Sequence, residues 1–395
     1  LGACMKKIAY RITIIIITIL LANPFVQVNA TEEPSPLKLH ALSALLMDAE
    51  SGRVLYEKNG FERLPMASTT KIMTCIMALE NSSMDEIVTI SHYASTMPDV
   101  QLNVLKDEQY KMKDLLHSLM LESHNDVAVA IAEHVGGSVE GFASLMNQKA
   151  RDLGAFDTNF VTPNGLDSEE HYTTAADLAK ITAYAIKNET FLKITNESSY
   201  SFADINGKRM FQVNNKNSFL NQMNGAMGVK TGFTGRAGYC FVGAVNQDGK
   251  TLISVVLGSG WPPNKSYKWN DTKFLMYYGL NNYYNKTIYE DEKDIKRILV
   301  EDGIFDFTST YSEGSLSMLV REGEDIDFTY YIPDSIMAPV VKGSIVGYVE
   351  ISINGNPYIK YPIKISDSIE KITFPYCLKK VFERFMLMEI VVNHN

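Results

Sequence analysis

The sequence has few cysteines and no excess of basic residues. Four cysteines scattered along 395 residues indicate neither a zinc knuckle nor a small disulfide framework. Two of them, Cys75 and Cys240, lie in apolar contexts and are predicted to be buried thiols. Lys and Arg number 37 against 46 Asp and Glu, a net charge of −9, which argues against a nucleic-acid binder.

Glycine, proline and long apolar runs are also scarce. The 25 Gly and 13 Pro are too few for a low-complexity protein, and a hydrophobic fraction of 46% argues against a disordered one. The apolar run at 12–22 follows basic residues and is short for a membrane span, as in a signal peptide. Small residues at Val28 and Ala30 predict cleavage after Ala30. Residues 1–30 are thus predicted to be an N-terminal extension and signal peptide of an exported protein, with an uncleaved anchor as the alternative.

The chain is long enough for two or three domains. Two pairs of strand-like runs stand far apart, 44–48 with 53–57 and 238–245 with 251–257. Between them, helical periodicity extends from about 111 to 187. This order predicts an α+β domain over 31–288, in which an antiparallel sheet collects strands from both ends around a helical middle.

The rest of the chain differs in character. Residues 289–371 alternate short β-like runs with turns, which predicts a small all-β domain. The tail, 372–395, is predicted to hold an amphipathic helix suited to a membrane interface. The alternative is a helix docked on the protein's own core. The residues of its apolar face are Leu378, Val381, Phe382, Phe385, Met388 and Val392.

Three short motifs stand in order along the chain, and each is weak alone. They are S-T-T-K at 68–71, at a predicted helix start, S-H-N at 123–125, between helical runs, and K-T-G at 230–232, in a predicted strand. A serine hydroxyl is a poor nucleophile until a neighbouring base takes its proton. Because positions i and i+3 share one helix face, Lys71 can reach the Ser68 hydroxyl and act as that base.

The remaining motif residues suit binding and proton transfer. A lysine base needs a lowered pKa, which burial or a second cation can provide, and Lys230 is the candidate cation. Ser123 can relay a proton to a leaving amine, and Asn125 can bind a substrate amide and hold the lysine base. Lys230 and Thr231 offer a cation and a hydroxyl to a substrate carboxylate. Gly232 lets a substrate backbone approach the strand closely.

The motifs and their surroundings resemble the penicillin-binding proteins and serine β-lactamases. The segments at 64–74, 123–126, 162–167 and 228–234 narrow this resemblance to the low-molecular-mass D-alanyl-D-alanine carboxypeptidases. It implies a β-lactamase/penicillin-binding-protein-like catalytic domain in which Ser68 attacks the penultimate D-Ala of a peptidoglycan stem pentapeptide. The terminal D-Ala leaves, and water hydrolyses the acyl-enzyme.

The resemblance also implies partners and a location. Backbone N–H groups of Ser68 and Phe233 would form the oxyanion hole, β-lactams would acylate Ser68, and neither a metal nor an organic cofactor is implied. The protein would lie at the outer face of the bacterial cytoplasmic membrane, in contact with the cell wall. The sequence departs from the family's usual pattern at Asn164 and Phe233. Arg236 is either a ligand of the substrate carboxylate or a solvated surface residue.

Three other functions stay open on sequence alone. A β-lactamase on the same fold would need efficient deacylation, and no clear carboxylate motif for that role is present. A DD-endopeptidase that cuts D-Ala cross-links is chemically close to a carboxypeptidase. A non-catalytic cell-wall scaffold is disfavoured because the residues of all three motifs are intact.

Overall fold

The structure is a computed structural model that describes residues 37–392, with side chains described as far as Phe385. The predicted signal peptide at 1–30 lies outside the described residues. Between residues 37 and 392, every helix is too short or too polar to cross a membrane. Both cysteines predicted to be buried thiols are buried and unpaired, and burial raises the pKa of the Cys240 thiol to about 12.

One antiparallel sheet of five strands forms the centre of the N-terminal part. Its strands are β1 (Ser43–Asp48), β2 (Val54–Lys58), β7 (Ala226–Thr234), β8 (Gly238–Gln247) and β9 (Lys250–Leu257). The order across the sheet is β2-β1-β9-β8-β7. Because β1 pairs with β9, with Ser43 opposite Leu257, strands from both ends of the region share one sheet. The predicted α+β architecture is confirmed.

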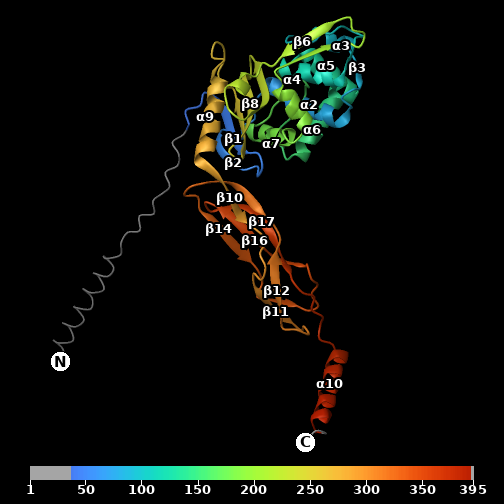
Figure 1. The fold of residues 1–395 in the computed structure, drawn as a ribbon, viewed down its shortest axis with the longest axis vertical. Coiled ribbons are helices and arrows are strands. Elements are labelled where there is room, and N and C mark those ends of the chain that lie inside the picture. The colour runs from blue at the N-terminus through green and yellow to red at the C-terminus, as the bar shows by residue number, and fades with distance from the viewer. Residues whose placement is uncertain (1–36, 393–395) are drawn as a thin grey trace, which may run out of the picture. The chain divides into compact units, whose positions relative to one another are not determined.

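Helices cover both faces of this sheet, with α9 on one side and a group of helices on the other (Figure 1). Strands β8 and β9 are therefore buried along most of their length. The helix α2 is buried from Lys71 to Ala78, so its lysine lies within the hydrophobic core. The helices are α2 (Lys71–Asn81), α3 (His92–Ser95), α4 (Met112–Leu121), α5 (Asn125–Gly136), α6 (Val139–Asp152), α7 (Ala175–Ala185), α8 (Glu189–Asn196) and α9 (Tyr267–Asn282).

Short elements complete this part of the chain. Two small two-stranded antiparallel sheets and two 3₁₀ turns connect the helices to one another and to the main sheet. They are β3 (Ile87–Thr89) with β4 (Gln109–Lys111), β5 (Ser199–Ala203) with β6 (Met210–Asn214), and the turns η1 (Ala67–Thr70) and η2 (Ser218–Asn221).

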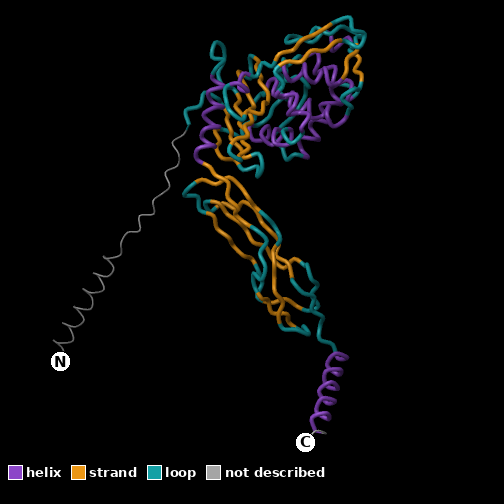
Figure 2. Tube along the Cα trace, in the orientation of Figure 1, coloured by secondary structure: helices purple, strands orange, loops and turns teal. Residues whose placement is uncertain are grey.

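Between α9 and α10 the chain is strand and turn, as predicted (Figure 2). One sheet has the order β14-β16-β17-β12-β11-β15, and β10 pairs with β13 in another. Since β10 begins at Tyr283, the predicted limit at 288/289 falls at the end of this strand. The strands are β10 (Tyr283–Tyr289), β11 (Arg297–Glu301), β12 (Phe307–Ser312), β13 (Leu316–Arg321), β14 (Ile326–Tyr331), β15 (Ser335–Met337), β16 (Ile345–Ile353) and β17 (Asn356–Ile365), and α10 (Phe374–Val392) follows.

Candidate active site

Ser68 lies on the turn that leads into α2. The sequence predicts a helix starting near this serine, and the structure places it in the 3₁₀ turn η1, one turn before the α-helix begins at Lys71. The preceding residue, Ala67, has a positive φ of 49°, which a non-glycine residue adopts only under structural constraint. Ser68 is half-buried, and its Oγ lies 3.0 Å from Lys71 Nζ. The i to i+3 spacing therefore brings the two groups together as predicted.

Lys71 is fully buried and donates three hydrogen bonds. Its Nζ contacts Ser68 Oγ at 3.0 Å, Asn125 Oδ1 at 2.9 Å and the backbone oxygen of Asn164 at 2.6 Å. These acceptors are all neutral. Burial lowers the pKa of Lys71 well below its usual value, and the charge of Lys230 lowers it further, while Asp126 opposes the shift. A lysine in this environment is suited to take up a proton from the serine.

Asn125 is held in one orientation by backbone carbonyls. Its Nδ2 donates to the oxygens of Pro98 (3.1 Å) and Asp99 (3.0 Å). Because these contacts use the amide nitrogen, the carbonyl oxygen Oδ1 must face Lys71. The residue begins α5, so its position is also set by the helix. The structure thus brings together the first two motifs, which are far apart in sequence.

Ser123 precedes α5 in a left-handed conformation, with φ of 74°. This conformation is uncommon for a residue with a side chain. Its Oγ is buried, and no described residue provides a hydrogen-bond partner. Buried polar groups are usually paired, so an unpaired hydroxyl lining the cleft beside Ser68 is available to a substrate or to a proton transfer.

The third motif lies on β7, against the turn that carries Ser68. Lys230 is buried, and burial together with the nearby charge of Lys268 lowers its pKa to about 7. At Gly232, an added Cβ would lie 3.1 Å from Ala67 Cβ and from the Ser68 nitrogen. The glycine therefore permits close packing between the strand and the nucleophile's turn. Access of a substrate backbone at this position stays a prediction.

A single cleft exposes residues of all three motifs. Phe233 lines it and is 43% exposed, with its ring centroid 4.6 Å from that of Tyr239. Arg236 is exposed and lies outside the lining of the cleft. The lining residues are Ser68, Val100, Glu122, Ser123, Lys216, Thr231, Gly232, Phe233, Tyr239, Lys265 and Lys268.

Lys268 is a site residue that sequence reasoning missed. It projects from α9, is 3% exposed, and has no hydrogen bond or ion pair to a described residue. Its Nζ lies 4.8 Å from the ring centroid of Tyr239 and 4.9 Å from that of Trp269. Burial, followed by the charge of Lys265, lowers its pKa to about 8. A largely buried lysine without an anionic partner, which lines the cleft beside Thr231, is suited to bind a carboxylate.

The loop at 162–167 supplies a further missed contact, because the backbone oxygen of Asn164 accepts a hydrogen bond from Lys71. The loop is tied to α2 by Thr74 Oγ1, which donates to the oxygen of Pro163 at 2.6 Å. Gly165 has a φ of 84°, and a Cβ there would lie 2.0 Å from the oxygen of Ala67. Only glycine fits this position. The T-P-N-G-L-D sequence at 162–167 marks this loop in the sequence, but it does not indicate that a backbone oxygen contacts Lys71.

His171 supports the nucleophile's turn from behind. Its Nδ1 accepts from the backbone N–H of Val161 at 3.0 Å, so its Nε2 carries the proton that Thr70 Oγ1 accepts at 2.8 Å. Burial and the charge of Lys71 lower the pKa of His171 to about 4. The ring is therefore neutral near pH 7. Nothing in the sequence around His171 indicated this role.

Comparison with known proteins decides the family. Residues 27–260 match the family model of peptidase S11, D-alanyl-D-alanine carboxypeptidase, and residues 283–371 match that of the penicillin-binding protein 5 C-terminal domain. The chain belongs to the peptidase S11 family of serine-type D-alanyl-D-alanine carboxypeptidases. This family acts on peptidoglycan stem peptides that end in D-Ala-D-Ala and binds β-lactams. The resemblance drawn from the motifs is confirmed.

Individual relatives cover nearly the whole chain. D-alanyl-D-alanine carboxypeptidase DacF of Bacillus subtilis is 30% identical over 384 residues, which cover 95% of this chain and 98% of DacF. DacC of Escherichia coli is 28% identical and covers 88% of this chain, with 88% of its own length matched. The crystal structure of penicillin binding protein 5 from Haemophilus influenzae superposes with a TM-score of 0.72 at 27% identity, covering 86% of this chain and 100% of that one.

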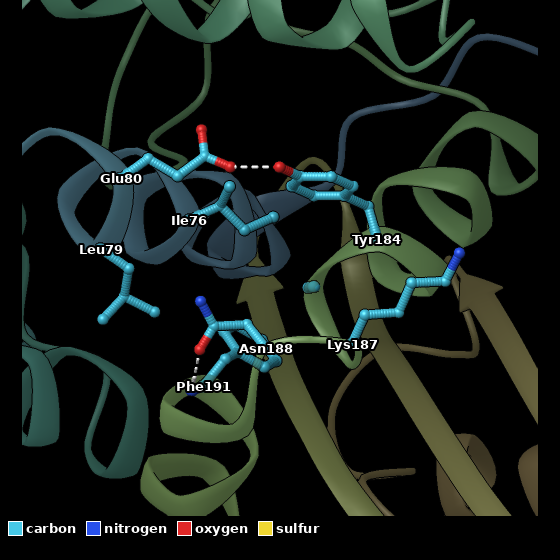
Figure 3. Close-up of a pocket in the computed structure, with 8 residues that line it drawn as sticks. Ile76, Leu79, Glu80, Tyr184, Lys187, Asn188 and Phe191 are labelled. Carbon is cyan, nitrogen blue, oxygen red and sulfur yellow. Dashed lines mark hydrogen bonds between the residues drawn. The ribbon is translucent and has the colours of Figure 1, made fainter.

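A second hollow lies at the C-terminal end of α2, and its apolar lining residues include Ile76, Leu79 and Phe191 (Figure 3). Figure 3 shows the hydroxyl of Tyr184, which donates a hydrogen bond to the Glu80 carboxylate beside this hollow. None of the residues predicted to act in peptidase S11 chemistry lines this hollow. The cleft at Ser68 is therefore the candidate active site.

Proposed function

We propose that Ser68 is the nucleophile and Lys71 the general base of the carboxypeptidase reaction. The observation that carries this proposal is the 3.0 Å contact between Ser68 Oγ and the Nζ of a fully buried lysine with a lowered pKa. In the neutral form of Lys71, Nζ accepts the hydrogen bond from Ser68 Oγ and donates only to Asn125 and Asn164. As Oγ bonds to the carbonyl carbon of the penultimate D-Ala, its proton passes along this bond to Lys71. The carbonyl oxygen becomes an oxyanion held by the backbone N–H groups of Ser68 and Phe233, each typically worth about 3 kcal/mol.

Collapse of this intermediate breaks the bond to the terminal D-Ala. The leaving nitrogen receives the proton from Lys71 through the hydroxyl of Ser123, which has no other partner among the described residues. An ester between the remaining peptide and Ser68 results. Water then attacks this ester, its proton passes to Lys71, and the serine alkoxide recovers that proton as the acyl bond breaks. Asn125 keeps the lysine oriented throughout, and its Oδ1 accepts a hydrogen bond from the substrate amide N–H, because both N–H groups of Nδ2 are used by Pro98 and Asp99.

The terminal carboxylate of the substrate is proposed to bind between Thr231, Lys230 and Lys268. Thr231 and Lys268 line the cleft on the side of β7 and α9, and both lysines are buried. A carboxylate there would provide the anion that Lys268 lacks. Arg236 is not needed for this contact, because it is exposed outside the cleft lining.

The test of the catalytic roles measures D-alanine release from a D-Ala-D-Ala-terminated pentapeptide together with the mass of the β-lactam adduct. Release by the wild type, with both release and adduct lost in Ser68→Ala, supports the proposal. The exposed Ser201 provides the control Ser201→Ala, which should retain both. A β-lactam adduct that persists in Ser68→Ala would rule out this serine as the nucleophile.

The domain organisation and the location are part of the same proposal. An exported chain would comprise the catalytic domain at 31–288, the β-rich domain at 289–371 and a membrane-associated helix at 372–395. Support comes from α10, where Leu378, Val381, Phe382 and Phe385 are exposed. Met388 and Val392 have side chains outside the described residues.

The membrane part has its own test, which is co-sedimentation of the full chain with anionic phospholipid vesicles. Replacement of Phe382 and Phe385 by Ser should lower the bound fraction, because the apolar face supplies the attachment. The exposed Phe156 provides the control Phe156→Ser. Equal binding of both variants would refute attachment through α10.

A further inference from the structure

The first turn of α5 carries a buried carboxylate that the proposed mechanism does not use. Asp126 directly follows Asn125 and is 1% exposed. Its Oδ1 accepts the backbone N–H of Leu102 at 3.0 Å and that of Val127 at 2.9 Å, and its Oδ2 accepts the N–H of Val104 at 3.2 Å. No ion pair joins it to a cation within residues 37–385. A buried charge that is held by backbone donors alone fixes the segments that supply them.

Two of these bonds fasten a loop that lines the cleft. Leu102 and Val104 belong to the segment between α3 and β4, and Val100 of the same segment is part of the cleft lining. From 98 to 104 the chain forms neither helix nor strand, so no regular backbone ladder holds its shape. The conformation of this 98–104 loop therefore depends on bonds to its neighbours, and those to the Asp126 carboxylate are buried.

The same loop holds the side chain of Asn125 in place. The oxygens of Pro98 and Asp99 accept its two Nδ2 N–H groups at 3.1 and 3.0 Å, and the oxygen of Val100 accepts its backbone N–H at 2.7 Å. While these bonds persist, Oδ1 must face Lys71 and the substrate. A loop that lost its buried anchor would move these acceptors and leave the amide free to rotate.

The carboxylate also influences the titratable groups around it. Burial and the charge of Lys230 on β7 lower the pKa of Lys71, and the charge of Asp126 opposes this shift. Burial likewise lowers the pKa of His124, while Asp126 and Glu122 oppose that shift. A variant without the carboxylate would therefore have a lower pKa at both Lys71 and His124. The pH dependence of the reaction thus reports the loss of this charge separately from any loss of structure.

We infer that Asp126 is a positioning residue for the carboxypeptidase reaction: it fastens the 98–104 loop to the start of α5, and this loop holds the Asn125 amide in its working orientation. The inference rests on the proposed roles of Asn125 and Lys71. Asp126 acts through Asn125 and not on the substrate, because its carboxylate is buried and lies outside the cleft lining.

The first test is a double-mutant cycle on the rate of acylation by benzylpenicillin, followed by the mass of the adduct. Asp126→Asn keeps the size of the side chain but replaces one acceptor oxygen by a donor that faces a backbone N–H. This variant should be acylated about tenfold more slowly than the wild type. In an Asn125→Ala background the same substitution should change the rate by less than about twofold, because the amide that Asp126 positions is absent.

Two further measurements separate positioning from damage to the fold. The acid limb of the pH profile for acylation should shift to lower pH in Asp126→Asn, because the charge that raises the pKa of Lys71 is lost. Hydrogen exchange in peptides that cover the 98–104 loop should become faster in this variant, while exchange in β8 stays slow.

The matched control is Asp177→Asn, at another buried carboxylate in the first turn of a helix. Asp177 Oδ2 accepts the backbone N–H of Asp157 at 2.7 Å, and neither residue lines the cleft. This control loses a comparable anchor and should keep the wild-type acylation rate, acid limb and loop exchange. If Asp126→Asn fails to fold, Asp126→Glu serves in its place. It keeps the charge but misplaces the oxygens, so it should lower the rate and leave the acid limb unchanged.

A wild-type acylation rate in Asp126→Asn would overturn the inference. An equal loss in the wild-type and Asn125→Ala backgrounds, or unchanged exchange of the 98–104 loop, would do the same. In these cases D-alanine release and the adduct at Ser68 would still support the proposed function. A wild-type acylation rate in Asn125→Ala alone would instead refute the proposed role of Asn125, and the inference would fall with it.

Discussion

Removal of the charge at Lys268 should raise the stability of the protein and lower its catalytic efficiency. Lys268 is 3% exposed and has no anionic partner among the side chains of residues 37–385. Burial lowers its pKa from 10.5 to about 8. At about 1.4 kcal/mol for each pH unit, the buried charge destabilises the fold by about 3 kcal/mol. Loss of the contacts with the Tyr239 and Trp269 rings, worth about 1 kcal/mol each, offsets part of the gain in a Lys268→Met variant.

We therefore expect Lys268→Met to raise the free energy of unfolding by about 1 to 2 kcal/mol at pH 7. The gain depends on pH in a defined direction. Below pH 8 the lysine is charged in both folded and unfolded states, and the full destabilisation is present. Between pH 8 and 10.5 the unfolded state binds more protons, so wild-type stability rises with pH relative to the variant. The advantage of Lys268→Met should fall across this window.

Urea denaturation at pH 7 and pH 10 measures this difference, with Lys193→Met as the control for loss of an exposed lysine. Lys268→Met should also lower kcat/KM for D-alanine release by about tenfold or more, because a charge-assisted hydrogen bond contributes about 1.5–3 kcal/mol. A Lys268→Met variant that is less stable than the wild type at pH 7, or that retains full kcat/KM, would refute the reasoning.

Three further predictions concern the surroundings of the nucleophile. Asn125→Asp places a carboxylate beside Lys71 and should raise the pKa of the lysine. The acid limb of the pH profile for β-lactam acylation should therefore shift to higher pH. An unshifted acid limb would contradict Lys71 as the base. Gly165→Ala should lower the free energy of unfolding, measured by urea denaturation, by about 3 kcal/mol or more, because the added Cβ clashes with the oxygen of Ala67. The control Gly235→Ala adds its Cβ in open space and should change the free energy of unfolding by less than about 1 kcal/mol. With a folded pKa near 4, His171 binds fewer protons folded than unfolded, so wild-type stability should fall as pH drops from 6.5 to 4; His171→Gln should flatten this fall in thermal melts, and an unchanged slope would exclude His171 as its source.

Some features followed from the sequence because they depend on local spacing. The interval of three residues between Ser68 and Lys71 predicts their contact in any helical turn, and the structure has it at 3.0 Å. The hairpin of β8 and β9 was visible from two strand-like apolar runs on either side of a turn at 246–249. The helix α10 was visible from its periodicity. In each case neighbouring residues contain the whole signal.

The pairing of distant strands was only partly visible. The order of strands and helices predicts one sheet built from both ends of the region, but it does not specify that β1 pairs with β9. That pairing places β7 at an edge of the sheet, against the turn of Ser68. The three motifs converge for this reason.

Other features of the site exist only in the tertiary structure. The Asn164 oxygen that holds Lys71 is a backbone group, and every residue has one, so no residue type marks it. Lys268 reads in sequence as an ordinary charged residue on a helix. Only the packing of α9 on β8 buries its ammonium among aromatic rings beside the cleft. The sequence determined which chemical groups are present and which near neighbours meet. The depressed pKa values of Lys71, Lys230 and Lys268 came from burial, which depends on the whole fold.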